Sequence, residues 1–173
     1  MPESSSPAGQ ILASPLLSKL ATASELPVRL AALPRPVVFT NGVFDVVHRG
    51  HVTCLEQARA QGASLVVALN SDASARRLGK GPGRPLNRQE DRAAVIAALQ
   101  SVTLVTWFDE DTPVELLRRV QPDVYCKGGD YDMALLEEAR VVSQWGGRAV
   151  ALGFVDGYST TALVDRAREP EDG

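Results

Sequence analysis

The chain has 173 residues, of which 45% are hydrophobic and 23% charged, and its formal net charge is -3 at pH 7. This composition is typical of one globular domain with its own core, and the negative charge argues against a protein that coats nucleic acid. No apolar run reaches the roughly 18 residues of a membrane-spanning helix, and the polar start differs from a signal peptide. With two cysteines that lack metal-type spacing, these features predict a cytoplasmic protein without membrane or nucleic-acid partners.

Short apolar runs alternate with amphipathic segments along most of the chain. Residues 1–10 are expected to be disordered, 11–35 to form a helical prelude, 36–168 the main domain and 169–173 a frayed tail. Strands are expected at 37–40, 64–70, 102–108, 123–128 and 148–154. Helices are expected at 49–61, after residue 72, at 88–100, from residue 113, through about residue 143, and at 159–168. The alternation predicts an α/β fold, a Rossmann-like, doubly wound, five-stranded parallel sheet with the first strand central.

Two helix caps are also predicted. Asn87 is expected to cap the helix at 88–100, and Asp111 or Thr112 the helix with Pro113 in its first turn.

In such a sheet, ligands bind beyond the carboxyl ends of the strands. Polar segments follow four of the five expected strands at this edge: 40–51, 70–72, 127–130 and 157–161. The sequence therefore predicts one cleft to which all four contribute.

Both histidines of the chain, His48 and His51, fall in the first of these segments. They are three residues apart on the first turn of the expected helix, so they share a face. Free N–H groups at a helix start attract anions, and two imidazoles there add donors for phosphate oxygens. Gly50 lets a nucleotide approach the backbone, and Asp45 lies in the same cleft. A capping histidine beside a surface histidine, or a metal pair, are the alternatives, but no H-E-x-x-H pattern is present.

A basic, glycine-rich loop at 78–87 contains Lys80 and Arg84. It is not a Walker A motif, since no Ser or Thr follows Lys80. The loop is interpreted either as a phosphate clamp or as a solvated surface loop. Arg92, in the helix that follows, is expected to reach a phosphate or to pair with a neighbouring glutamate.

Two further segments carry both a functional and a structural interpretation. Lys127 and Asp130 flank two glycines, which form either a cradle for a base or ribose or a plain left-handed turn. The hydroxyl residues 159–161 are expected to cap the last helix, and the same helix start suits phosphate binding.

Residues 40–59 resemble the H-x-G-H signature of the nucleotidyltransferases, in the form TNGVFDVVHRGHVTCLEQAR. The resemblance covers about residues 36–166 and continues through LNSDASARRLGKGPGRPLN, RQEDRAAVIAALQSV, EDTPVELLRRVQPDVYCKGGDY and DGYSTT. The motifs KGGDY and GKGPGRP are similar to those of the adenylyltransferase domain of bacterial heptose phosphate enzymes, which make ADP-D-glycero-β-D-manno-heptose for lipopolysaccharide core. Val43 stands where this family often has cysteine, and Tyr158 where relatives often have a small residue.

The resemblance implies transfer of AMP from ATP to D-glycero-β-D-manno-heptose 1-phosphate, with release of pyrophosphate. It implies catalytic roles for His48, His51 and Lys80, and contacts to the sugar phosphate for Asp45 and Asn70. The residues it implies for nucleotide binding are Phe39, Thr40, Asn41, Gly50, Arg92, Lys127, Gly128, Asp130, Ser159, Thr160 and Thr161.

The resemblance also implies partners. Mg²⁺ is expected on the triphosphate, held mostly by phosphate and water rather than by protein ligands. A homodimer is expected, and a separate heptose kinase is expected upstream, because residues 1–35 are too short for the kinase that is fused in many relatives.

Two other functions remain open at this point. The first is a cytidylyltransferase acting on glycerol 3-phosphate or another alcohol phosphate. Such relatives tend to carry an arginine before the STT segment, and this chain has FVDGYSTT there. The second is a non-catalytic nucleotide-binding module, which would not need donors suited to a transition state such as His48, His51 and Lys80.

Overall fold

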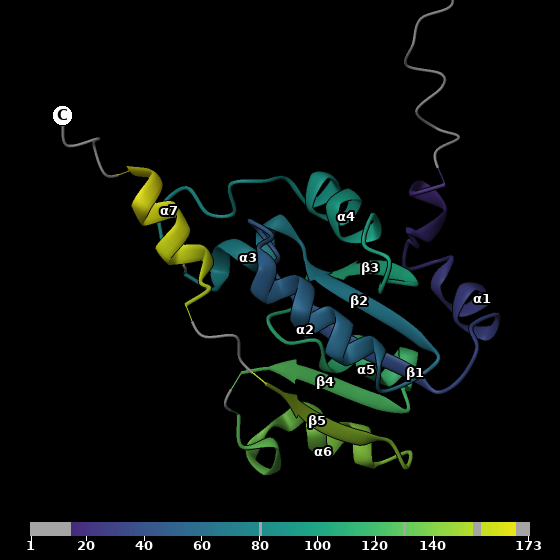
Figure 1. Ribbon diagram of the computed structural model, residues 1–173. Coiled ribbons are helices and arrows are strands. Elements are labelled where there is room, and N and C mark those ends of the chain that lie inside the picture. The colour runs from purple at the N-terminus through teal and green to yellow at the C-terminus, as the bar shows by residue number, and fades with distance from the viewer. Residues whose placement is uncertain (1–14, 80, 130, 154–156, 169–173) are drawn as a thin grey trace, which may run out of the picture.

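Five parallel strands form a single sheet in the order β3-β2-β1-β4-β5 (Figure 1). The strands are β1 Val37–Gly42, β2 Ser64–Asn70, β3 Leu104–Phe108, β4 Val124–Gly128 and β5 Arg148–Leu152. This computed structural model describes residues 15–79, 81–129, 131–153 and 157–168. The predicted α/β fold, all-parallel sheet and central first strand are confirmed. The expectations for Lys80, Asp130, the first ten residues and the tail lie outside the described residues.

The strand register brings the carboxyl ends of the strands to one edge of the sheet. Gly42 pairs with Leu69, Asn70 with Phe108 and Gly128 with Leu152. The order of the strands reverses between β1 and β4, and this switch point is where ligands bind in sheets of this kind.

Helices cover both faces of the sheet (Figure 1). They are α1 Leu26–Ala31, α2 Arg49–Arg59, α3 Asp72–Arg77, α4 Gln89–Ala97, α5 Val114–Val120, α6 Glu137–Ser143 and α7 Thr160–Arg168, with 3-10 turns η3 Leu17–Lys19 and η4 Met133–Leu135. None of the helices in the described ranges is long and apolar enough to cross a membrane.

Two cores form because successive strand residues point to opposite faces. On one face, Phe39 and Tyr125 pack in a cluster with Leu117 of α5. On the other face, Val38 packs in a cluster with Leu55 of α2. All seven residues of β2 are buried, which explains why its sequence is almost continuously apolar rather than alternating.

The side-chain caps predicted for α4 and α5 are wrong. Helix α4 has Arg88 as its N-cap residue, and the side chain of Asn87 donates to the carbonyl of Asp45 at 2.6 Å. Helix α5 has Pro113 as its N-cap residue with no side-chain cap. Asp111 instead accepts a hydrogen bond from Arg77 at 2.6 Å. In each case the side chain that the local sequence predicts as a cap forms a hydrogen bond with a residue distant in the sequence instead.

The segment before β1 is less helical than expected in its described part. It contains η3 and α1 only, and between them Leu20 forms a parallel bridge with Val105 of β3. This bridge covers part of the exposed edge of the sheet.

Candidate active site

The two histidines lie together at the start of α2. His48 is the N-cap residue, and its backbone N–H donates to Nδ1 of His51 at 3.4 Å. The imidazole rings stack with their centroids 3.9 Å apart and an angle of 27° between their planes. Because α2 begins at the switch-point edge, the pair and the free N–H groups of the first helical turn face the same region.

Burial favours the uncharged form of His48. Desolvation lowers the pKa of this imidazole below its ordinary value. Its Nδ1 atom is buried and has no hydrogen-bond partner among the described residues. The site therefore presents an imidazole whose uncharged form is favoured by burial and whose Nδ1 lacks a hydrogen-bond partner within the described ranges, next to a helix start that favours anions.

Residues at the ends of β1 and β2 are held from within the protein. The Tyr125 hydroxyl donates to Oδ1 of Asn41 at 3.1 Å, which links the beginning of β4 to the carboxyl end of β1. The Asn70 amide donates to Oγ of Ser74 at 3.0 Å and is nearly buried. Phe39 and Thr40 are buried as well, so these two residues contribute backbone rather than side-chain atoms.

The carboxyl end of β4 is more exposed to solvent than the ends of β1 and β2. Gly128 is exposed, and Lys127 lies 3.4 Å from a carboxylate oxygen of Glu138 and 5.0 Å from the centre of the Tyr131 ring. A Cβ on Gly128 would lie 2.7 Å from Sγ of Cys54. The backbone at this position therefore approaches α2 closely, which only glycine permits.

Asp45 anchors the glycine-rich loop instead of presenting a free carboxylate. Its oxygens accept hydrogen bonds from Arg84 Nε at 2.6 Å and from the N–H groups of Leu86 and Asn87 at 2.8 and 2.9 Å. Burial raises the pKa of Asp45, but the N–H groups of Asn87 and Leu86 and the Arg84 guanidinium outweigh burial and leave the pKa below its ordinary value. In this arrangement the glycine-rich loop occupies both carboxylate oxygens, and the expected contact to a sugar phosphate stays a prediction.

The polar groups of Arg92 also bind other parts of the protein. Its side chain is fully buried and donates to the carbonyls of Val43 and Asn87 at 2.6 and 3.1 Å and to Asp72 at 2.8 Å. The charged partner is therefore Asp72 rather than a neighbouring glutamate, and the guanidinium is shielded from solvent. It joins the loop before α2 to α3 and α4.

The start of α7 packs against the loop that leads to α2. The Thr160 hydroxyl donates to the carbonyl of Val46 at 3.3 Å. Ser159 caps α7 by accepting from the N–H of Ala162 at 3.3 Å, and Thr161 is exposed. Figure 1 shows α7, in yellow, on the side to which the arrowheads of β4 and β5 point. The predicted meeting of the first and last segments at this edge is thus present.

Several contributing residues were not singled out from the sequence for the roles they have. Phe44 packs its ring edge-on to His51. Tyr125 donates a hydrogen bond to Asn41, and Asp72 accepts one from Arg92. The sequence carries no local signal for these contacts, because each joins segments far apart in the chain or depends on an unusual backbone conformation.

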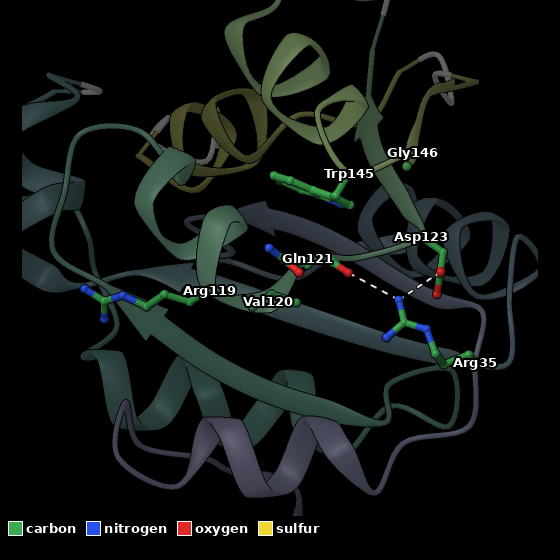
Figure 2. A pocket seen from close by; sticks show the side chains of 8 residues that line it. Arg35, Arg119, Val120, Gln121, Asp123, Trp145 and Gly146 are labelled. Atoms are coloured by element: carbon green, nitrogen blue, oxygen red, sulfur yellow. Dashed lines mark hydrogen bonds and ion pairs between the residues drawn. The ribbon is translucent and has the colours of Figure 1, made fainter.

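A cavity of about 250 Å³ lies at the opposite edge of the sheet, beside the amino ends of β1, β4 and β5. Figure 2 shows the Arg35 guanidinium between the carbonyl of Gln121 and the carboxylate of Asp123. The partners of Arg35 are thus supplied by the protein itself. Since ligands of this fold bind beyond the carboxyl ends of the strands, the histidine edge is the better candidate for the site.

Comparison with known proteins defines the class of the chain. Residues 39–166 match the family model described as cytidylyltransferase-like. The chain therefore belongs to the cytidylyltransferase-like family of nucleotidyltransferases.

Relatives within this class confirm the resemblance to the heptose enzymes. The chain is 58% identical over 154 residues to D-beta-D-heptose 1-phosphate adenylyltransferase of Bordetella bronchiseptica, covering 88% of this chain and 95% of that protein. It is 55% identical over 132 residues to the bifunctional protein HldE of Ectopseudomonas mendocina, covering 76% of this chain but 28% of that protein. The chain thus matches the whole of a single-domain relative and a part of a longer one.

Solved structures agree with the fold. A lipopolysaccharide core biosynthesis protein from Thermoplasma volcanium superposes with a TM-score of 0.58 at 27% identity, covering 69% of this chain and 95% of that one. Pantothenate synthetase from Thermus thermophilus superposes with a TM-score of 0.53 at 19% identity, covering 78% of this chain and 62% of that one. The second likeness concerns the fold alone.

Proposed function

We propose that the chain transfers the AMP group of ATP to D-glycero-β-D-manno-heptose 1-phosphate, giving ADP-heptose and pyrophosphate. An oxygen of the sugar phosphate forms a bond to the α-phosphorus, and the bond from that phosphorus to the bridging oxygen of pyrophosphate breaks. The observation that carries the proposal is the stacked pair His48 and His51 at the start of α2. The substrate comes from the 58% identical relative that is named for this activity.

The reaction needs positioning and charge stabilisation more than proton transfer. A phosphate monoester is already ionised at neutral pH, so it attacks without a general base. The protein must align two anions and stabilise the charge that builds on the α-phosphate and the leaving group. His48 and His51 supply donors for these oxygens, and the start of α2 adds free N–H groups. The uncharged form of His48, which burial favours, still keeps one ring N–H as a donor for a phosphate oxygen.

The remaining contacts follow from the edge on which the residues lie. Gly128 exposes its backbone at the end of β4, which suits the adenosine, and the start of α7 at 159–161 suits the nucleotide phosphates. Lys80 and Asp130 stay predictions for the leaving group and the adenosine. Asn70, held by Ser74, is proposed to face the sugar phosphate.

We propose that Mg²⁺ enters the site bound to ATP. Among the described residues, no group of three or more His, Cys, Asp or Glu side chains is placed to hold a metal ion. The donor set here, imidazoles and N–H groups, is suited to phosphate oxygens rather than to a hard cation. In this proposal the metal is held by the phosphates and by water, where it neutralises negative charge.

ADP-heptose is a precursor of lipopolysaccharide core, and we propose that the reaction takes place in the cytoplasm. Because the acceptor already carries a phosphate at C1, we propose that a separate heptose kinase acts before this enzyme. Formation of a homodimer stays a prediction.

The test is release of pyrophosphate with Mg²⁺ and each of ATP, CTP, GTP and UTP. D-glycero-β-D-manno-heptose 1-phosphate is one acceptor and glycerol 3-phosphate is the other. Turnover only with ATP and the heptose phosphate is expected. Turnover with CTP and glycerol 3-phosphate would establish the cytidylyltransferase alternative. ATP binding without turnover, in folded protein, would favour the non-catalytic module.

A further inference from the structure

Four rings form a continuous column at the start of α2. The Phe44 ring meets His51 edge-on with centroids 5.3 Å apart, and His51 stacks on His48 at 3.9 Å. The Tyr158 ring then lies 6.1 Å from the His48 ring at an angle of 25°. The guanidinium carbon of Arg49 is 6.0 Å from the centre of the Tyr158 ring. We call Phe44, His51, His48 and Tyr158 the ring column.

The two outer rings come from outside α2. Phe44 belongs to the loop after β1, and Tyr158 to the segment before α7. Each end of the imidazole pair is therefore bounded by an aromatic ring whose position is set by another part of the fold. Aromatic contacts at these spacings favour particular ring orientations.

The Tyr158 end of the ring column packs closely against Gly50. A Cβ on Gly50 would lie 3.0 Å from Cβ of Tyr158 and 3.0 Å from Cε1 of His48. Gly50 thus allows Tyr158 and the His48 ring to lie close over the helix start, in addition to any approach by a nucleotide.

The Phe44 end carries an unusual backbone conformation. Phe44 has a φ of 50°, in the left-handed region that is unfavourable for a bulky residue. Its ring packs against Gly42, where a Cβ would be 3.0 Å from Cε2 of Phe44. Strained residues of this kind persist where the surrounding structure fixes them, and they concentrate at functional sites.

We propose that Phe44 and Tyr158 are positioning residues that fix the ring planes of His51 and His48, so that the imidazole N–H groups point to the transferring phosphate. The consequence for rate rests on the proposed function, whereas the fixed geometry of the rings does not. An imidazole without a neighbouring ring can rotate about its side-chain bonds, and a misdirected donor loses rate rather than substrate affinity.

The experiment compares Tyr158→Leu with Tyr158→Phe. Because the chain has two histidines, its NMR spectrum contains only two imidazole Hε1 signals, which a His51→Gln variant assigns. Tyr158→Leu is expected to shift the His48 signal and to lower kcat at least about tenfold, with the KM for ATP changed less than about threefold. Tyr158→Phe retains the ring and is expected to restore both the signal and kcat. Phe44→Leu and Phe44→Tyr test the His51 end in the same way.

Trp145→Leu is the control for loss of stability. It removes an aromatic ring and the hydrogen bond to the Pro122 carbonyl at the opposite edge of the sheet. It is expected to lower the melting temperature without moving the histidine signals or kcat. Unchanged histidine signals in folded Tyr158→Leu would overturn the proposal, and so would shifted signals with an unchanged kcat. If the wild-type protein shows no turnover, the proposed function fails. Nuclear Overhauser contacts between the His48 and His51 rings, which report ring orientation and do not depend on the ring current of Tyr158, still decide whether the column fixes the rings.

Discussion

Asp45 and Arg84 form an ion pair of 2.6 Å whose side chains are 2% and 9% exposed. The two residues belong to the loop before α2 and to the glycine-rich loop, and the pair fixes one loop against the other. The same carboxylate also accepts from two backbone N–H groups of residues 86 and 87. We predict that Asp45→Asn lowers the free energy of unfolding by about 2–4 kcal/mol, because it leaves a buried guanidinium without its charge partner. Urea denaturation at pH 7 measures this loss.

The same pair has a defined pH dependence. The pKa of Asp45 is lowered in the folded protein, so the unfolded chain binds more protons as the pH falls below about 4. The stability that Asp45 provides is therefore complete above that pH and is lost as the pH falls through the lower, folded pKa. Asp45→Asn is expected to remove this part of the acid dependence. An equally steep loss of stability in the variant would contradict the assignment.

Arg92 is predicted to be essential for stability rather than for phosphate binding. Its guanidinium is fully buried and donates to two carbonyls and to Asp72. Arg92→Lys keeps the charge but cannot reproduce this planar set of donors, so we expect a loss of about 2–4 kcal/mol of unfolding free energy. In the fraction that remains folded, the KM for ATP is expected to stay near the wild-type value. A large rise in this KM with normal stability would instead support a phosphate contact.

We predict that Cys54, and not the nucleotide alone, prevents a side chain at position 128. A Cβ at position 128 would lie 2.7 Å from Cys54 Sγ but 3.9 Å from its Cβ. Gly128→Ala is therefore expected to displace the end of β4 and to raise the KM for ATP several-fold. The double variant Cys54→Ala, Gly128→Ala removes the sulfur and is expected to restore most of the affinity. Cys54→Ala alone is the matched control, and failure of the double variant to recover would mean that the new methyl group meets the nucleotide itself.

His48 makes stability depend on pH near neutrality. Burial lowers its pKa in the folded state, so the unfolded chain takes up a proton first as the pH falls through about 6.5. The contribution of His48 to stability is therefore expected to decrease as the pH falls from 7.5. Below the folded pKa of His48 this contribution no longer changes. Urea denaturation of wild type and His48→Gln at pH 7.5 and 5.5 checks this. The variant is expected to lose less stability between the two pH values than the wild type does.

Much of the fold is predictable from the sequence because its signals are local. The apolar, β-branched residues of β1 and β2 predict buried parallel strands, and the spacing of His48 and His51 places them on one helical turn. The edge at which the polar segments meet follows from the rule that parallel strands end together.

The interpretations that fail concern side chains with long-range partners. The local sequence predicts Asn87 as a helix cap, but its amide donates a hydrogen bond to the Asp45 carbonyl. The substrate contact of Asp45 stays a prediction, but its observed partner Arg84 was not predicted, because the two residues meet only after two loops have folded together. The partners of Arg92 come from three different segments. In each case the residue type is correct for a polar contact, and the partner is decided by tertiary structure that local pattern does not contain.

The most direct test of the account is the effect of His48→Ala and His51→Ala on kcat and on ATP affinity, measured separately. We predict that each substitution lowers kcat for ATP and the heptose phosphate by about 10²-fold or more, roughly 3 kcal/mol of transition-state stabilisation. Calorimetry is expected to find ATP affinity changed only modestly, because the imidazoles act chiefly on charge that develops during transfer. An unchanged kcat in both variants would contradict the proposal that this histidine pair stabilises the transferring phosphate.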